Sequence, residues 1–289
     1  MNNDKPDHFS PHNWMTVTPA IDNLSLLELT LPGTHNAGSD WKASYPLLSP
    51  PRHWLACQHD SFNAQLRHGS RALDVRLIWE PKAVGLGKFR VHHNGHRNSR
   101  TLGELITDIK AFLGQNPDEF IIVDFHELQG DSFDFAYFNA TILQLLGDQI
   151  IPAQNRHLSL GQLKEISAKQ RVLVAAPPDS ALDRRVFLER IRHKWIGNTI
   201  VGSADLQQYI VEVLKYPPGT WAPWSLSATS YSVLGGPVDI HTELDKWFDP
   251  QNSDWAIKCN IINVDFIEES KIVSCCRTVN LKKASQKIN

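Results

Sequence analysis

The sequence predicts an α/β protein, a TIM-type (β/α)8 barrel that forms a single domain over residues 1–289 with its core at about 14–280. Three observations support this fold class. Eight short apolar runs are typical of strands, most of them precede a stretch with helical periodicity, and the eight units occupy roughly 250 residues, as in such barrels. Strand 225–229 is the weakest of the eight, and without it the alternatives are an irregular or incomplete barrel or a doubly wound sheet.

The first half of the chain alternates between strands and helices. A short helix or extended cover at 13–23 places Trp14 on the barrel, and Pro32 and Gly33 end the first strand. Thr101 and Glu104 are spaced as a helix capping box. In order, we expect strand 26–31, loop 40–56, helix 58–68, strand 70–78, strand 88–93, helix 101–114, strand 120–125 and helix 133–147.

The second half repeats the alternation. We expect helix 159–168, strand 171–176, helix 180–194, strand 199–203, helix 205–215, loop 216–226, strand 225–229, helix 238–249, strand 260–265 and helix 268–280. The two long loops contain tryptophans among prolines, which predicts a lid, a pocket rim or a membrane-touching surface, or else tryptophans that only roof the barrel or pack in its core. These tryptophans are Trp41, Trp54, Trp221 and Trp224.

The composition excludes several classes of protein. Hydrophobic residues make up 42% of the chain and charged residues 21%, so a sizeable core can form. A net charge of -2 without a basic block predicts no nucleic-acid partner. No apolar run reaches the roughly 18 residues of a membrane-spanning helix, and the polar stretch 1–13 lacks the apolar core of a signal peptide. The four cysteines have no metal-site spacing and read as ordinary thiols. We expect a monomer that is cytoplasmic, or secreted without a visible signal peptide.

Polar residues follow the predicted strands at the points where the strands end. In a parallel barrel these ends meet at one face, which is where such folds carry their chemistry. Asp74 and Arg76 also share one face of their strand, because residues i and i+2 do. The polar residues at these ends are His35, Asn36, Asp74, Arg76, His93, His126, Asp205, Ser227 and Asp265.

This set of side chains suits phosphoryl transfer. Two histidines across a site can act as base and acid in one step, since imidazole titrates near neutral pH. An arginine between them can hold a phosphate through two hydrogen bonds. Asp265 ends the last strand, which neighbours the first strand in a closed barrel, so its carboxylate can reach His35 and stabilise the charged imidazole.

Five stretches resemble the X-domain of phosphatidylinositol-specific phospholipase C, in particular the bacterial enzymes and the small single-domain X-domain proteins. The stretches are LPGTHNAGS (31–39), GSRALDVRL (69–77), FRVHHNG (89–95), TLGELITDIKAFLGQNPDEFIIVDF (101–125) and NIINVDF (260–266). The resemblance covers about residues 14–280 in order and is dense in 24–128 and 258–267. As a set, the motifs are specific.

The resemblance implies a role for each matching residue. His35 matches the general base that takes the proton of the inositol 2-hydroxyl, and Asp265 matches the aspartate paired with it. His93 matches the general acid and is favoured over His92 by its spacing to Thr101, while His96 stays open as an alternative. Arg76 matches the arginine with which the metal-independent bacterial enzymes bind the phosphate.

The chain also departs from the family pattern. Asn36 stands where the bacterial enzymes have an aspartate, and where the calcium-dependent enzymes have an asparagine as metal ligand. The latter carry an acidic ligand at the place of Arg76, and a guanidinium inside a cation site would cost several kcal/mol through Coulomb repulsion. We therefore expect no cofactor and disfavour calcium. His126 replaces a lysine of some relatives, and Ala175 and Ala176 stand where a substrate-binding arginine is expected.

The sequence thus predicts an enzyme that cleaves phosphatidylinositol to diacylglycerol and a cyclic inositol phosphate. Its partner is a membrane phospholipid, met through transient contact with the membrane surface. His126, Asp205 and Ser227 are the expected substrate-binding residues, and the catalytic set is His35, Asn36, Asp74, Arg76, His93 and Asp265. The alternatives are a metal-dependent glycerophosphodiesterase or sphingomyelinase-type barrel and a non-catalytic phosphoinositide-binding barrel.

Overall fold

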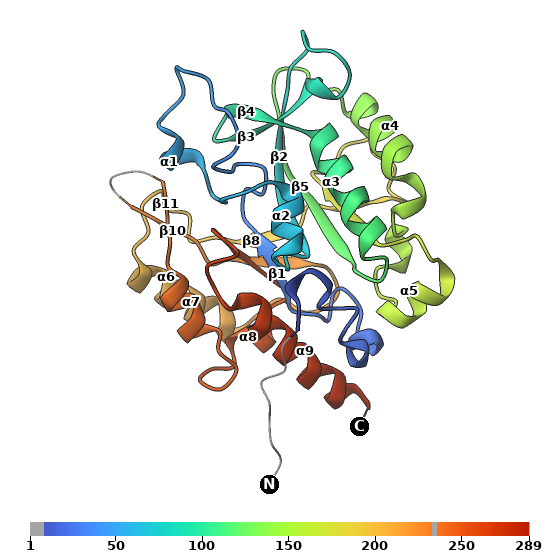
Figure 1. The fold of residues 1–289 in the computed structure, drawn as a ribbon, viewed down its shortest axis with the longest axis vertical. Coiled ribbons are helices and arrows are strands. Elements are labelled where there is room, and N and C mark those ends of the chain that lie inside the picture. Colours follow the sequence, from blue (N-terminus) through green and yellow to red (C-terminus); the bar gives the residue numbers. More distant parts are fainter. Residues whose placement is uncertain (1–8, 233–235, 289) are drawn as a thin grey trace.

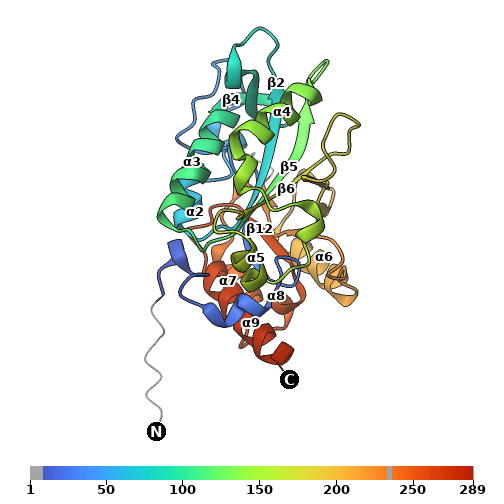
Figure 2. The same cartoon turned by 90° about the vertical axis from the view of Figure 1, so that its right-hand side faces the viewer.

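The computed structural model describes residues 9–232 and 236–288, so most of the polar stretch 1–13 lies outside the described residues. A curled sheet runs through the molecule, with helices packed on its outer face (Figures 1 and 2). The strands are β1 (Leu31–Thr34), β2 (Ala72–Trp79), β3 (Phe89–His93), β4 (His96–Thr101), β5 (Ile121–Gln129), β6 (Val172–Ala176), β7 (Phe187–Glu189), β8 (Arg192–Lys194), β9 (Trp224–Ser227), β10 (Ser230–Tyr231), β11 (Pro237–Val238) and β12 (Ile261–Val264).

Helices follow most of the strands. The α-helices are α1 (Arg52–Leu55), α2 (Phe62–Arg67), α3 (Leu102–Gln115), α4 (Phe135–Leu146), α5 (Leu160–Ile166), α6 (Ser203–Lys215), α7 (His241–Trp247), α8 (Trp255–Lys258) and α9 (Ile272–Ile288). Thr101 caps α3, and the capping box with Glu104 is present as predicted. Within the described residues, no helix is long and apolar enough to cross a membrane.

The sheet is an open barrel of parallel strands. Hydrogen-bonded neighbours follow the order β7-β6-β5-β2-β1-β12-β9-β8, and each of these pairs is parallel. No ladder joins β7 to β8 in the described part of the chain. Both belong to one extended segment interrupted only by Arg190 and Ile191, whose first half pairs with β6 and whose second half pairs with β9. The α/β class and the irregular form of the TIM-type barrel are confirmed.

The first strand lies later than predicted. Residues 24–30 form turns, and β1 begins at Leu31 and includes Pro32 and Gly33. The prediction was wrong because it took these two residues as breakers. Gly33 pairs with Asn263 and Ala72 in the ladders, and a Cβ at Gly33 would collide with the side chain of Asn263. A residue without a side chain is therefore needed inside this tight part of the barrel.

The predicted barrel strand 88–93 is instead one arm of a hairpin. β3 pairs antiparallel with β2, and β4 pairs antiparallel with β3. β2 is long enough to extend past the barrel rim, where β3 turns back along it (Figure 1). The returning direction brings the carboxyl end of β3, at His93, back to the rim where the other strands end.

The predicted helix 180–194 and strand 199–203 are both wrong. The first region contains β7 and β8, while Val201 makes only an isolated bridge before α6 begins at Ser203. The local pattern did not show this, because pairing with β6 and β9 stabilises the extended form. Asp205 consequently lies in the first turn of α6, exposed, rather than at a strand end.

The inward face of the barrel changes character along its strands. Near their amino ends the inward positions are apolar, as at Leu31, Ile122 and Leu173. Two and four residues further on, the same face bears small or polar side chains, because inward positions recur every second residue. These include Gly33 and His35 on and after β1, and Asp124 and His126 on β5. The polar groups therefore gather at the carboxyl end of the barrel.

Candidate active site

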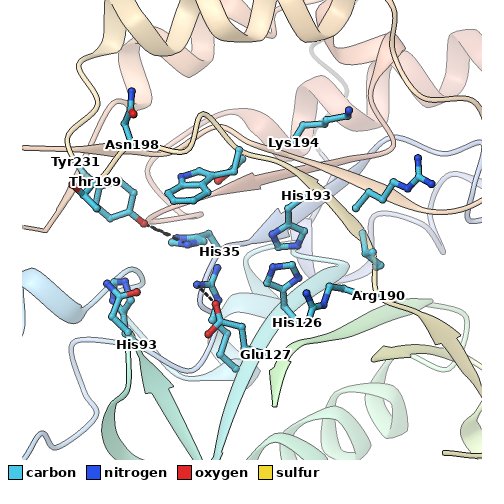
Figure 3. Close-up of a pocket in the computed structure, with 16 residues that line it drawn as sticks. His35, His93, His126, Glu127, Arg190, His193, Lys194, Asn198, Thr199 and Tyr231 are labelled. Carbon is cyan, nitrogen blue, oxygen red and sulfur yellow. Dashed lines mark hydrogen bonds and ion pairs between the residues drawn. The ribbon is translucent and has the colours of Figure 1, made fainter. Parts of the chain in front are cut away.

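A pocket of about 650 Å³ opens at the carboxyl ends of the strands (Figure 3). Five of the predicted residues line it, namely His35, Arg76, His93, His126 and Ser227. Asn36, Asp74 and Asp265 are buried and contact these lining residues. Asp205 is absent from the lining, which corrects its prediction as a substrate-binding residue. The other lining residues are Asn94, Glu127, Arg190, Ile191, Arg192, His193, Lys194, Trp195, Asn198, Thr199 and Tyr231.

His35 and Asp265 form a buried hydrogen-bonded pair. Nδ1 of His35 lies 2.8 Å from Oδ1 of Asp265 and donates to it, since a carboxylate accepts. Nε2 is then the unprotonated nitrogen of the ring, and it accepts from Nδ2 of Asn36 at 3.3 Å. Burial raises the pKa of Asp265, while the neighbouring imidazole of His35 opposes that rise. Nε2 is thus the ring nitrogen placed to take up a proton, as a general base must.

Asn36 connects the first two strands of the site. Its φ of 45° lies in the left-handed region, which asparagine tolerates better than most residues. Its backbone N–H donates to Oδ2 of Asp74 at 3.2 Å, and the N–H of Ala37 donates to the Asp74 carbonyl oxygen. The loop after β1 is thereby fixed against β2, with the Asn36 amide beside the His35 ring.

Arg76 is held by two carboxylates at the edge of the pocket. Its guanidinium donates to both carboxylate oxygens of Asp74, at 3.2 and 2.9 Å, and to Glu127 at 3.0 Å. Burial alone would raise the pKa of Asp74, but the charge of Arg76 holds it well below its ordinary value. Asp74 and Arg76, which were predicted to share one face of their strand, form an ion pair. The guanidinium of Arg76 therefore lines the pocket in a fixed orientation.

His93 lies opposite His35. The ring centroids are 6.3 Å apart and the rings are perpendicular. Nδ1 of His93 is 2.8 Å from the carbonyl oxygen of Leu55 and donates to it, which leaves Nε2 as the ring nitrogen free to exchange a proton. Burial, together with the nearby His35, lowers the pKa of His93 to about 3. His92 and His96, the alternatives to His93, do not line the pocket.

Sequence reasoning missed the wall that β8 and the segments near it contribute. The Tyr231 hydroxyl lies 3.2 Å from Nδ1 and 3.4 Å from Nε2 of His35, and burial raises the pKa of that hydroxyl well above its ordinary value. The segment RIRHKW at 190–195 supplies cations, an imidazole and the half-exposed Trp195. Polar and apolar side chains alternate in this segment, which is typical of a strand, but we predicted a helix over 180–194.

The residues at the family's calcium position do not fit a calcium ion. Asn36 and Asp74 offer oxygen atoms, yet both carboxylate oxygens of Asp74 are bound by Arg76. A cation there would meet a guanidinium at hydrogen-bond distance, which is strongly unfavourable. Elsewhere in the described residues, two groups bring possible ligand atoms within 4.8 Å of one another: His35, Cys57 and Asp265, and Asp124, His126 and His193.

The geometry can support acid–base attack on a phosphodiester. Two imidazoles lie with their ring centroids 6.3 Å apart at the wall of the pocket, and a guanidinium lines the same pocket. Imidazoles move protons, and a fixed guanidinium stabilises the charge that develops on phosphoryl oxygens.

Known proteins are similar to this chain in sequence and in fold, although no protein-family model matches it. A variant-surface-glycoprotein phospholipase C of Trypanosoma cruzi is 30% identical over 188 residues, which cover 61% of this chain and 48% of that protein. A 1-phosphatidylinositol phosphodiesterase of Staphylococcus aureus (strain Newman) is 30% identical over 115 residues, which cover 39% of this chain and 33% of that protein. These matches thus span half or less of the curated relatives.

The fold agrees with these sequence matches. The phosphatidylinositol-specific phospholipase C from Listeria monocytogenes superimposes with a TM-score of 0.68 at 17% identity, over 94% of this chain and 99% of that one. At such low identity the superposition shows a shared fold alone. The chain is thus similar in sequence and in fold to phosphatidylinositol-specific phospholipases C, as its motifs predicted.

Proposed function

We propose that the protein is a phosphatidylinositol-specific phospholipase C that cleaves phosphatidylinositol to diacylglycerol and inositol 1,2-cyclic phosphate. The single observation that carries the proposal is the pair of imidazoles 6.3 Å apart in the pocket that Arg76 also lines. The names of the two relatives described above refer to a variant surface glycoprotein and to phosphatidylinositol. Cleavage of a phosphodiester fits the side chains of this site.

The reaction begins at His35. Nε2 takes the proton of the inositol 2-hydroxyl, and the freed oxygen attacks phosphorus to form the cyclic phosphodiester. Asp265 stabilises the imidazolium that results, through the hydrogen bond at Nδ1. The hydroxyl proton therefore ends on His35, and the bond between phosphorus and the glycerol oxygen breaks.

His93 completes the step by giving the Nε2 proton to the leaving glycerol oxygen. A pKa of about 3 means that this ring is neutral in the free protein at pH 7, so it must gain its proton when the substrate binds. An anionic phosphodiester favours the charged imidazole and supplies that shift. Arg76 binds the non-bridging phosphoryl oxygens and stabilises their growing charge. His126 and Ser227 line the region available to the headgroup hydroxyls.

The substrate is a membrane lipid, so the proposal includes transient contact with a membrane surface. The loop that follows β1 supports this part. Leu47 and Leu48 at its tip are fully exposed, and Trp54 in α1 is 44% exposed. Apolar side chains at a loop tip are suited to entering the interface of a bilayer.

The test is turnover of phosphatidylinositol vesicles followed by phosphorus NMR, with and without EDTA. We expect a cyclic phosphate in both samples, with a kcat at saturating vesicle concentration that EDTA leaves unchanged, and no product from His35→Ala. Loss of turnover in EDTA would instead indicate a metal-dependent phosphodiesterase. Vesicle binding without any product would indicate a binding protein, and either result would overturn the proposal.

A further inference from the structure

A second group of titratable side chains lies at the wall of the pocket and takes no part in the proton transfers of the proposed reaction. Asp124 and His126 come from β5, and His193 comes from β8. Nε2 of His193 is 3.0 Å from Oδ2 of Asp124, and Nδ1 of His126 is 3.2 Å from the same oxygen. The two imidazoles are stacked, with centroids 3.5 Å apart and planes 5° from parallel (Figure 3). Two ring nitrogens thus converge on one carboxylate oxygen.

The open barrel is what brings these residues together. β5 and β8 are not neighbours in the sheet, but the curl of the sheet brings His193 of β8 to Asp124 of β5. Ala175 of β6 is the ladder partner of Asp124, so its small side chain shares the face of Asp124. A methyl group at this place leaves space for His193 to reach the carboxylate. Ala175, which stands where a substrate-binding arginine was expected, therefore leaves room for the imidazole of His193.

The internal contacts of this cluster do not satisfy its polar atoms. Asp124 is only 4% exposed, and its Oδ1 has no hydrogen-bond partner among the described residues. Nδ1 of His126 is also buried and lacks a hydrogen bond, because its approach to Asp124 is poorly aligned. A buried carboxylate oxygen without a partner costs about 1–3 kcal/mol or more. Such a cluster is incomplete without a further ligand.

The charges in direct contact with the cluster leave the Asp124 carboxylate for a cation. Arg76 forms ion pairs with Asp74 and Glu127 but none with Asp124. Arg190, Arg192 and Lys194 also line the pocket, and among the described residues none of them forms an ion pair with Asp124. Arg76 is turned toward Asp74 and Glu127, whereas the unpartnered oxygen belongs to Asp124.

We propose that Asp124, His126 and His193 bind a divalent transition-metal ion of the Zn²⁺ class, whose remaining coordination positions face the pocket and take hydroxyl oxygens of the headgroup. Two imidazoles and one carboxylate are a donor set that Zn²⁺ accepts with an open position, whereas Ca²⁺ and Mg²⁺ prefer oxygen ligands. Binding turns the stacked rings out of parallel, because the in-plane lone pairs of both nitrogens must point at an ion about 2.1 Å away. The headgroup part rests on the proposed function, and ion binding does not.

The group formed by His35, Cys57 and Asp265 is the competing location. Its ligand atoms also lie within 4.8 Å of one another. However, His35 and Asp265 already satisfy each other through their hydrogen bond, and neither Cys57 nor Asp265 lines the pocket. An ion there would have to break the acid–base pair, whereas the cluster around Asp124 opens directly onto the pocket through His126 and His193.

The experiment is a titration of the full-length, chelator-treated protein with Zn²⁺, in competition with a chromophoric chelator, alongside Ca²⁺ and Mg²⁺. We expect one Zn²⁺ per chain, no competition from Ca²⁺ or Mg²⁺, and affinity at least about tenfold weaker in His193→Asn and Asp124→Asn. His241→Asn is the matched control, because His241 forms an exposed pair with Asp239. Circular dichroism verifies that each variant is folded.

The outcomes separate this proposal from the proposed function. His35→Ala should bind Zn²⁺ as tightly as the wild type while losing turnover, and myo-inositol should tighten Zn²⁺ binding through linkage. Absence of stoichiometric Zn²⁺ binding overturns the site, as does wild-type affinity in both Asp124 and His193 variants. Loss of binding in Cys57→Ala alone assigns the ion to the competing location. If myo-inositol leaves the Zn²⁺ affinity unchanged, the proposed contact between the ion and the headgroup is wrong.

Discussion

The ring of His35 donates a 2.8 Å hydrogen bond to the carboxylate of Asp265, a residue 230 positions later in the chain. The pairing follows directly from the sheet. β1 and β12 are parallel neighbours in which Thr34 pairs with Val264, so the residues that follow each strand leave it side by side. Closing the barrel between its first and last strands therefore builds the proposed base.

Replacing Asp265 with asparagine should lower kcat by about 10²–10⁴-fold, because an amide cannot stabilise an imidazolium as a carboxylate does. The measurement is the initial rate on phosphatidylinositol vesicles. Asp205→Asn is the control, since that carboxylate is exposed on α6 and should leave the rate unchanged. A rate close to wild type for Asp265→Asn would remove the acid–base pair from the mechanism.

Arg76→Lys should lower kcat by about 10²–10³-fold with a smaller change in KM. Lysine keeps the charge, but it cannot bind Asp74, Glu127 and a phosphoryl oxygen in fixed directions as the guanidinium can. Arg97→Lys is a suitable control, because Arg97 makes an exposed ion pair with Glu80. If both variants retained full activity, the phosphate would be bound elsewhere.

Asn36→Asp should raise kcat/KM near neutral pH. Burial and His35 lower the pKa of His93 to about 3, so at pH 7 only about one free molecule in 10⁴ carries the acidic proton. A carboxylate at position 36 lies beside the His35–His93 pair and favours the charged imidazole. The pH–rate profile should show the acidic limb moving to higher pH. An unchanged limb would mean that His93 is not the titrating acid.

Acid sensitivity of the fold should decrease in His93→Asn. The folded protein keeps His93 neutral down to about pH 3, whereas the unfolded chain takes up a proton near pH 6.5. Stability is therefore lost as the pH falls below about 6.5. Between about pH 7.5 and pH 5, urea unfolding should show that the variant loses about 1–2 kcal/mol less than the wild type. Equal losses would contradict the lowered pKa.

Gly33→Ala should destabilise the protein by about 1–3 kcal/mol, because the new methyl group would overlap the side chains of Asn263 and Ile261 inside the barrel. Gly114→Ala offers the matched control. That glycine lies exposed within α3, with no atom near its missing Cβ, so alanine should be neutral or stabilising by up to about 1 kcal/mol. Thermal unfolding of the two variants tests the contrast, and equal melting temperatures would contradict it.

Local patterns were sufficient for the elements that carry strong signals of their own. The continuous apolar run of β5, the capping box of α3 and the Asp74–Arg76 alternation each predicted what is present. The ends of these strands also predicted that His35, Arg76, His93, His126 and Ser227 would line one pocket. The reason is that parallel strands share a direction, so their carboxyl ends meet wherever the sheet curls.

The sequence by itself determined which residues could do chemistry and, through its motifs, the kind of chemistry. Only the tertiary structure decided which of them meet. The hairpin of β3 and β4 turns His93 back to the rim, and the split segment of β7 and β8 brings His193 over Asp124 while leaving Asp205 on an exposed helix. These placements depend on hydrogen bonds between strands far apart in the chain, and no local window of sequence contains both partners.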